Sequence, residues 1–322
     1  MGTRIDVHAH FLPPFYREAL IAAGHEHPDG IAAIPAWDEQ RALDTMDSLG
    51  IDTAVLSISS PGVHFGDDRA AAELARRVND EAARLVAEHP GRFGFFASLP
   101  LPDVPGALTE LDRAMGELGA VGAVLESNHH GQYLGDPALA GLHAELAGRG
   151  GVLFVHPTAP FCGQELALGY PFPMLEFLFE TTRSITNLVL SGALERNPGL
   201  KVIVPHAGAV LPVLANRIDL LLPLLSAPGA PPPPGMKQAL RTLYFDLAGA
   251  PVPELLGALL QVADHEHILY GSDYPFTPAA ACAALAERID TTPLLAEPLR
   301  TAVLSGNAAR LFPTLVPAAH QS

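Results

Sequence analysis

Cysteine is scarce in this chain: its 322 residues include only two, Cys162 and Cys282. Two cysteines give neither a disulfide framework nor the paired spacing of a zinc ribbon. We therefore expect a reduced, cytoplasmic protein whose fold does not depend on disulfides.

Positive charge and long apolar runs are scarce as well. Lysine and arginine total 19 against 35 aspartates and glutamates, a formal net charge of −16. This balance argues against nucleic acid and anionic membrane surfaces as partners. Glycine, proline or charge interrupts the apolar stretches well before the roughly 18 residues that a membrane span needs. We expect a small-molecule substrate, and an anionic one would need a local positive charge such as a metal ion.

Short hydrophobic runs alternate with helical stretches along the chain. Hydrophobic residues make up 48% of it, enough for a large core. Eight runs are predicted as strands, at 3–8, 53–58, 93–98, 121–126, 152–156, 201–205, 243–247 and 267–271. Helices are expected between most of them, for example at 67–88 and 134–148. The pattern predicts an α/β fold, a distorted (β/α)8 TIM barrel that forms one domain over residues 1–322, with a doubly wound sheet as the competing architecture.

Two segments interrupt the alternation. Residues 11–50 are longer than a simple crossover and contain the single tryptophan, Trp37. We expect a small insertion there over the barrel mouth, after the first strand, followed by a helix at 38–49 with Asp38 as its N-cap. The proline-rich stretch 227–235 is predicted to be an extended surface loop, with a ligand for a proline-recognition domain as the alternative.

Residues of metal-binding type follow four of the predicted strands. His8 ends the first predicted strand and His10 lies two residues beyond it, His156 ends the fifth, and His206 and Asp273 follow the sixth and the eighth. Side chains at i and i+2 of a strand point the same way, so His8 and His10 can address one ion. Neutral imidazole and carboxylate suit a borderline-soft divalent metal. Since a closed barrel brings these strand ends around one point, the pattern favours the barrel and predicts a metal site of His8, His10, His156 and Asp273.

These residues give the chain a resemblance to the metal-dependent amidohydrolase superfamily. Within it, the chain is most similar to the branch of aminocarboxymuconate-semialdehyde decarboxylase and the resorcylate-type and 6-methylsalicylate-type decarboxylases. The similarity rests on the order and spacing of motifs such as Met46-Asp-Ser-Leu-Gly50, Glu180-Thr-Thr-Arg183, Pro205-His-Ala-Gly208, Gly271-Ser-Asp-Tyr-Pro275 and Gly306-Asn-Ala-Ala-Arg310. Some resorcylate decarboxylases begin with Glu-x-His where this chain has His8, so the all-histidine form is the closer analogy.

The resemblance implies roles for single residues. The four predicted ligands would hold one divalent ion, usually zinc and sometimes manganese. His206 would be the acid–base group beside the ion. Arg217 falls where related decarboxylases place an arginine that binds the substrate carboxylate, in some cases across a homodimer interface. Whether Arg217 would act in its own subunit or in a partner stays open, and a solvated surface arginine is the alternative.

The lysine content bears on the number of metal ions. Binuclear members of the superfamily bridge their two ions with a carboxylated lysine at the end of strand four. This chain has two lysines, Lys201 and Lys237, and its fourth strand ends in Glu126 and Ser127. We therefore expect a mononuclear site, with Glu126 as the one side chain there that could touch a second ion.

Two reactions fit the predicted site, with His206 and Asp273 as the catalytic groups. One is non-oxidative decarboxylation of a small aromatic or enolic acid, and the other is hydrolysis of a lactone or amide by activated water. The motifs favour decarboxylation, while a catalytically silent ligand-binding barrel is disfavoured by the complete ligand set. Ser60, Trp37 and Phe276 are candidate substrate contacts, although ordinary packing explains Trp37 and Phe276 equally well.

Overall fold

The computed structural model describes residues 3–227 and 234–315. Most of the predicted proline-rich loop, residues 228–233, lies outside the described residues, as does the end of the chain. The strands are β1 (Arg4–His10), β2 (Ile51–Ser57), β3 (Phe93–Phe95), β4 (Ala97–Ser98), β5 (Gly122–Glu126), β6 (Asn128–His129), β7 (Gln132–Tyr133), β8 (Val152–His156), β9 (Lys201–Val204), β10 (Tyr244–Asp246) and β11 (Ile268–Leu269).

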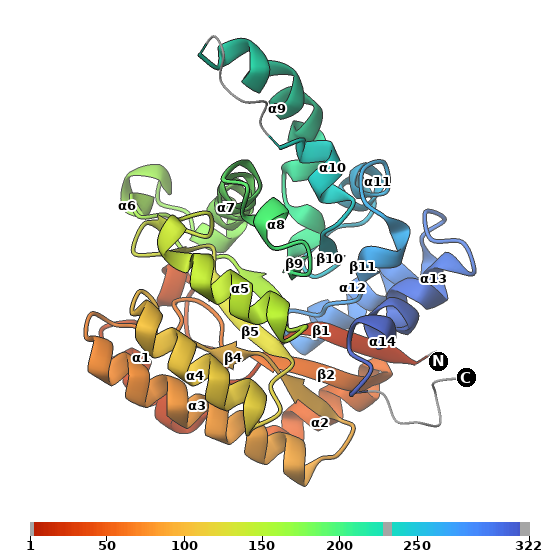
Figure 1. Cartoon of the computed structure of the whole chain (residues 1–322). Coiled ribbons are helices and arrows are strands. Elements are labelled where there is room, and N and C mark those ends of the chain that lie inside the picture. The colour runs from red at the N-terminus through yellow and green to blue at the C-terminus, as the bar shows by residue number, and fades with distance from the viewer. Residues whose placement is uncertain (1–2, 228–233, 316–322) are drawn as a thin grey trace.

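Helices follow most of the strands and cover them from outside (Figure 1). The α-helices are α1 (Pro14–Ala22), α2 (Glu39–Leu49), α3 (Asp68–Glu88), α4 (Val104–Gly116), α5 (Ala140–Gly148), α6 (Gly163–Leu166), α7 (Glu176–Leu190), α8 (Ala193–Arg196), α9 (Leu211–Leu225), α10 (Met236–Leu240), α11 (Glu254–Leu259), α12 (Ala279–Thr291), α13 (Leu299–Thr301) and α14 (Asn307–Leu311). Short 3₁₀ turns lie among them, including η1 (Pro28–Gly30), η3 (Phe172–Met174) and η4 (His206–Gly208). No helix in the described ranges is long and apolar enough to cross a membrane.

Parallel pairing closes the strands into a barrel. One sheet runs β1-β2-β3 and the other β4-β5-β8-β9-β10-β11. The two join at Phe96, between β3 and β4, because the Phe96 amide donates to Leu56 O at 2.9 Å while Phe95 O accepts from Val121 N at 3.0 Å. The last strand returns to the first through bridges from Tyr270 to Asp6 and from Tyr274 to Ala9. The predicted eight-stranded barrel is confirmed.

The predicted elements match the structure with small shifts at their ends. Helix α2 begins after Asp38, whose carboxylate accepts from Arg41 N at 2.9 Å as an N-cap. The run at 93–98 is divided at Phe96 into β3 and β4. The helix expected at 134–148 starts later, because Pro137 opens a short 3₁₀ turn over 137–139 before α5.

A β-bulge in β1 positions the first two predicted ligands. The register against β2 shifts between Asp6 and Ala9, which adds a residue to β1. Ile5 and Val7 belong to the apolar cluster inside the barrel, while Ala9 packs in the cluster between strands and helices. Bulges re-aim side chains in this way. Because of the bulge, the side chains of His8 and His10 point to the same side of the strand as those of Ile5 and Val7, and they lie at the mouth of the barrel.

Candidate metal centre and active site

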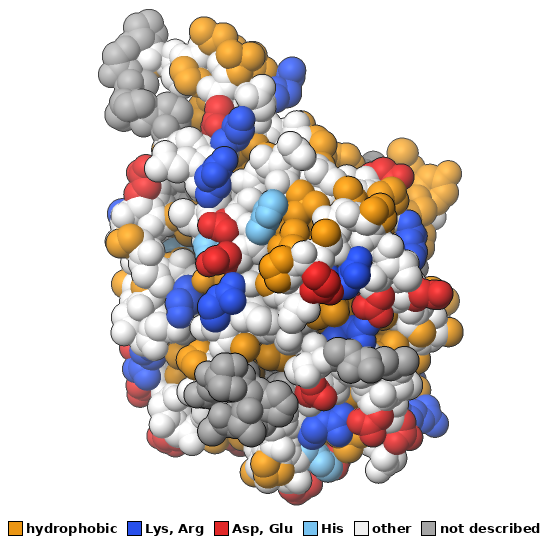
Figure 2. Space-filling view, turned by 90° about the vertical axis from the view of Figure 1, so that its right-hand side faces the viewer, with side chains coloured by type: hydrophobic (Ala, Val, Ile, Leu, Met, Phe, Trp, Pro, Cys, Tyr) orange, Lys and Arg blue, Asp and Glu red, His pale blue; other side chains and the backbone are white. Residues whose placement is uncertain are grey.

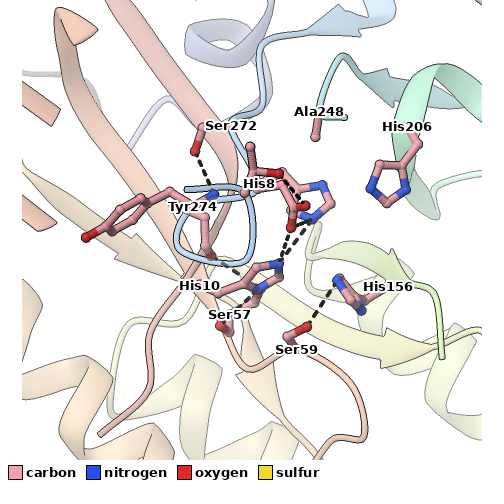
Figure 3. Close-up of polar contacts among 12 residues, drawn as sticks. His8, His10, Ser57, Ser59, His156, His206, Ala248, Ser272 and Tyr274 are labelled. Carbon is pink, nitrogen blue, oxygen red and sulfur yellow. Dashed lines mark hydrogen bonds and ion pairs between the residues drawn. The ribbon is translucent and has the colours of Figure 1, made fainter. Parts of the chain in front are cut away.

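Four side chains converge at the carboxyl ends of the strands, and we call them the donor set: His8, His10, His156 and Asp273. One nitrogen or oxygen atom of each lies within 4.8 Å of those of the others. The Nε2 atoms of His8 and His10 are 3.1 Å apart. Asp273 Oδ1 lies 3.2 Å from His10 Nε2 and 3.5 Å from His8 Nε2. Figure 3 shows the rings of His8, His10 and His156 turned toward one another, with His206 beside them.

Unusual backbone conformations present Asp273 and His206 to this centre. Both residues have positive φ values, 60° for Asp273 and 55° for His206. Non-glycine residues in this region are strained, and such strain is concentrated at functional sites. Gly271 and Gly249 make the approach possible, because a Cβ on Gly271 would lie 2.9 Å from His8 Cβ and one on Gly249 3.1 Å from His206 Cδ2.

Asp246 is a buried carboxylate behind the donor set and was not among the predicted site residues. Its Oδ2 lies 2.9 Å from His8 Nδ1, and its Oδ1 accepts from the backbone amides of His206 at 3.1 Å and Ala248 at 3.0 Å. A carboxylate that accepts the second ring proton of a metal-binding histidine fixes its tautomer and orientation. Asp246 thus holds His8 and the backbone of His206 at once. The only sequence signal for it is its place at the end of a predicted strand, 243–247.

The other two histidines of the donor set also have polar neighbours. His10 Nδ1 lies 3.0 Å from Ser57 Oγ and 3.3 Å from Ser57 O. His156 Nε2 lies 3.4 Å from Ser59 Oγ, and its Nδ1 is 3.5 Å from the carboxylate of Glu126. Figure 3 shows Ser57 beside the His10 ring and Ser59 beside the His156 ring.

Charge within the site favours a cation. Burial opposes ionisation of Asp273, but hydrogen bonds from His10 and His8 outweigh it and hold the pKa of Asp273 well below its usual range. Burial alone would lower the pKa of His8, yet the charge of Asp246, its hydrogen bond and Asp273 raise that pKa to about 10. Burial lowers the pKa values of His10 and His156, so both rings are available as neutral ligands. His8 therefore carries the proton that a metal ion would displace.

The donor set fits one divalent ion. Three imidazoles and a carboxylate are the ligands that zinc takes in proteins, and manganese accepts them as well. Glu126, the candidate contact for a second ion, is buried behind His156 and is not part of the cluster. Lys201 begins β9, at the opposite end of the strand from the site. The geometry thus supports a mononuclear centre.

A cavity of about 690 Å³ opens onto His156 and Asp273 of the donor set and onto His206. This size lies within the roughly 300–1,000 Å³ of small-molecule sites. Residues 28–35 of the predicted mouth insertion line it, together with side chains after β8 and β11. Its apolar wall includes Ile31, Ala33, Met174, Phe177, Leu255 and Phe276. No lysine or arginine from residues 3–227 or 234–315 lines this cavity. Within one chain, a metal ion on the donor set would therefore be the source of positive charge for an anionic substrate.

The predicted substrate residues are spread around this cavity rather than gathered in it. Phe276 lines the wall, with its ring centroid 5.5 Å from that of His10. Ser60 is buried behind the wall, where its Oγ lies 2.7 Å from Thr158 Oγ1. Trp37 packs on Phe11 outside the lining, and Arg217 is exposed on α9. The roles of Ser60, Trp37 and Arg217 in substrate binding remain predictions.

Comparison with known proteins connects this geometry to a family. The family model described as Amidohydrolase matches residues 5–314. The chain is 38% identical over 316 residues to 6-methylsalicylic acid decarboxylase of Penicillium expansum, with 97% of each protein covered. A crystal structure of an amidohydrolase II superposes with a TM-score of 0.90 at 34% identity, covering 96% of this chain and 99% of that one. The dihydroxybenzoic acid decarboxylase of a Polaromonas species, with bound manganese and 2-nitroresorcinol, gives a TM-score of 0.84 at 26% identity, with both chains fully covered.

Proposed function

The chain belongs to the amidohydrolase family, and on that premise we propose that it is a metal-dependent, non-oxidative decarboxylase of a small aromatic acid. The substrate class is a 2-hydroxybenzoate, with 6-methylsalicylate as the first member to test. The observation that carries the proposal is the complete donor set, with His206 beside it, at the floor of a largely apolar cavity. A relative that is 38% identical to this chain is a 6-methylsalicylic acid decarboxylase.

The cavity suits a substituted aromatic ring. Ile31, Ala33 and Leu255 offer apolar surface for a ring substituent, and Phe177 and Phe276 offer aromatic faces. A divalent ion held by the donor set would supply positive charge that attracts the substrate carboxylate and offsets negative charge as the carbon–carbon bond breaks. We propose zinc as this ion, with manganese as the alternative that the Polaromonas structure supports.

Decarboxylation needs a proton for the carbon that loses the carboxyl group. When the bond breaks, its electron pair stays on the ring carbon, a proton takes the place of the carboxyl group, and carbon dioxide leaves. Two residues at the cavity floor can carry that proton, His206 and Asp273. His206 lines the cavity, and its buried Nδ1 has no hydrogen-bond partner among the described residues, so no described group holds that nitrogen in one protonation state. Burial lowers the pKa of His206 from its usual range, which favours proton release.

Hydrolysis of a lactone or amide is the competing function, because it uses the same donor set. The apolar wall and the decarboxylase relatives favour the proposed reaction over it. A direct test is to incubate the metal-loaded enzyme with 6-methylsalicylate, 2,6-dihydroxybenzoate and a panel of aryl lactones, while measuring carbon dioxide and products. Carbon dioxide from the benzoates supports the proposal. Ring opening of the lactones without carbon dioxide from any acid would replace it with the hydrolase.

We further propose a homodimer in which α9 forms part of the interface. This helix projects from the barrel (Figure 1) and exposes Leu220, Leu224 and Leu225. Figure 2 shows hydrophobic side chains on this projecting part at the top of the molecule. Burying such leucines against a second copy would remove apolar surface from water. Arg217 on the same helix would then approach the cavity of the partner and supply the cation that the cavity lacks.

Subunit mixing tests whether Arg217 acts across an interface. In a mixed dimer of Arg217→Ala and Asp273→Asn chains, one site combines an intact donor set with an intact Arg217 from its partner. Random pairing of these two inactive variants in a twofold dimer would therefore restore about a quarter of wild-type activity. No restored activity in verified mixed dimers would assign Arg217 to its own subunit, whereas wild-type activity of Arg217→Ala alone would make it a surface residue. Because the two cysteines are free thiols, we propose the reducing cytoplasm as the compartment.

A further inference from the structure

His156 lies in the wall between two cavities, and its two ring nitrogens face different sides of that wall. Its Nε2 lies 3.4 Å from Ser59 Oγ, and Ser59 lines the active-site cavity. Its Nδ1 lies 3.5 Å from Glu126 Oε2, and Glu126 lines a separate cavity of about 370 Å³. Figure 3 shows the nitrogen that contacts Ser59 on the side of the ring nearer His10. Nε2 is therefore the nitrogen that can reach a metal ion on the donor set.

The contact between His156 and Glu126 joins two buried polar atoms that lack other partners. Neither His156 Nδ1 nor Glu126 Oε2 has a hydrogen-bond partner among the described residues, and both atoms are buried. A buried polar atom without a partner destabilises the fold. At 3.5 Å the two atoms need only a small movement to form a hydrogen bond, which would satisfy both at once.

The backbone leaves this pair of side chains little freedom to separate. Glu126 and His156 face each other on the paired strands β5 and β8, and the Ser127 amide donates to His156 O at 2.7 Å. Gly62, at a φ of 79°, packs beside the carboxyl group of Glu126, since a Cβ on Gly62 would lie 3.4 Å from Oε1. The Tyr16 hydroxyl donates to Gly62 O at 2.7 Å and holds this turn in place.

The direction of the hydrogen bond does not depend on the charge of Glu126. Burial raises the pKa of Glu126 well above its usual range, but a carboxyl group has an acceptor oxygen in either protonation state. A neutral histidine that binds a metal ion through Nε2 carries its single proton on Nδ1. In the metal-loaded protein His156 is therefore the donor and Glu126 the acceptor.

We propose that Glu126 is a positioning residue that accepts the Nδ1 proton of His156 and thereby holds Nε2 toward the metal ion. The proposal rests on the metal site of the proposed function and adds to it a residue that acts only through His156. Glu126 itself is not part of the donor set.

Glu126 differs from Asp246 in the number of donors that it faces. Both oxygens of Asp246 accept hydrogen bonds, whereas Glu126 Oε1 has no described hydrogen bond. A glutamine at position 126 can therefore turn its carbonyl oxygen to His156 and place its NH₂ group where Oε1 lies, without opposing a described donor. Glutamine should replace Glu126, although asparagine should not replace Asp246.

Zinc affinity of folded variants, measured by chelator competition, tests this role. Glu126→Met keeps the length of the side chain but has no oxygen, and it should lower zinc affinity by about 10–100-fold. Glu126→Gln should retain most of the wild-type affinity, because it restores the acceptor. Glu18→Met is the matched control, since Glu18 is exposed on α1, and it should bind zinc like wild type. Circular dichroism and melting temperature establish that each variant is folded.

Wild-type zinc affinity in Glu126→Met would overturn the proposal, and so would an equal loss of affinity in Glu126→Gln and Glu126→Met. If Glu126→Met does not fold, NMR of the zinc-loaded wild type with ¹⁵N-labelled histidine rings gives the answer. We expect the His156 proton on Nδ1, and a proton on Nε2 would overturn the proposal. Neither readout uses turnover, so an enzyme that releases no carbon dioxide would refute the proposed reaction and leave this test intact.

Discussion

Replacing Asp246 by asparagine should weaken metal binding although Asp246 does not touch the ion. All three partners of the Asp246 carboxylate are donors: His8 Nδ1, the amide of His206 and the amide of Ala248. An asparagine has one acceptor oxygen and one NH₂ group, so the NH₂ group must face at least one of these donors.

Either orientation of the asparagine damages the site. If the NH₂ group faces His8, it favours the tautomer with a lone pair on Nδ1 and a proton on Nε2, where the metal binds. If the NH₂ group faces the two amides, it places a donor against the backbone N–H groups of His206 and Ala248, which then lose their acceptor. Loss of such a partner behind a metal ligand typically lowers metal affinity 10–100-fold, about 1.4–2.7 kcal/mol.

Chelator competition on folded Asp246→Asn protein measures this effect. Asp44→Asn is the matched control, because Asp44 is exposed and contacts only Gln40 among its described hydrogen bonds. The control should keep wild-type metal affinity and kcat/KM. Wild-type metal affinity in Asp246→Asn would refute the role of Asp246 as the group that sets the His8 tautomer.

Three further outcomes are expected. His206→Ala should retain the metal and lose most of its activity, about 100-fold or more for a proton carrier; loss of the metal by elemental analysis would make His206 a ligand instead. Asp273→Asn should abolish turnover with an unchanged circular dichroism spectrum, and normal turnover would remove Asp273 from the site. Because His8 has a raised pKa of about 10 and must lose its proton on binding, metal affinity should rise about tenfold per pH unit between pH 6.5 and 9 and level off above pH 10. A flat pH profile in chelator competition would contradict this coupling.

The barrel and the grouping of the four donor residues could be predicted because each depends on a local pattern. Buried strands appear as short apolar runs, and a ligand at a strand end needs only the next polar residue, as with His156 and Asp273. The pairing of His8 and His10 follows from strand periodicity alone. The structure brings all four together, as their positions in the chain indicated.

Other features depend on contacts between distant segments and leave little trace in the sequence. The β-bulge before His8 is visible only in the register against β2. Asp246 resembles any other acidic residue at a strand end, and its role depends on His8, 238 positions away. The direction in which Arg217 points depends on how α9 projects from the barrel. The sequence around Trp37 does not show whether its ring lines the cavity or packs on Phe11, as it does in the structure.

Isotope incorporation tests the central claim most directly. The metal-loaded enzyme is incubated with 6-methylsalicylate in D₂O, carbon dioxide is measured, and the phenolic product is analysed by mass spectrometry and proton NMR. We expect one molecule of carbon dioxide per molecule of 3-methylphenol, with a single deuterium on the carbon that carried the carboxyl group. Unchanged 6-methylsalicylate, in an enzyme that hydrolyses lactones under the same conditions, would contradict the assignment of a decarboxylase.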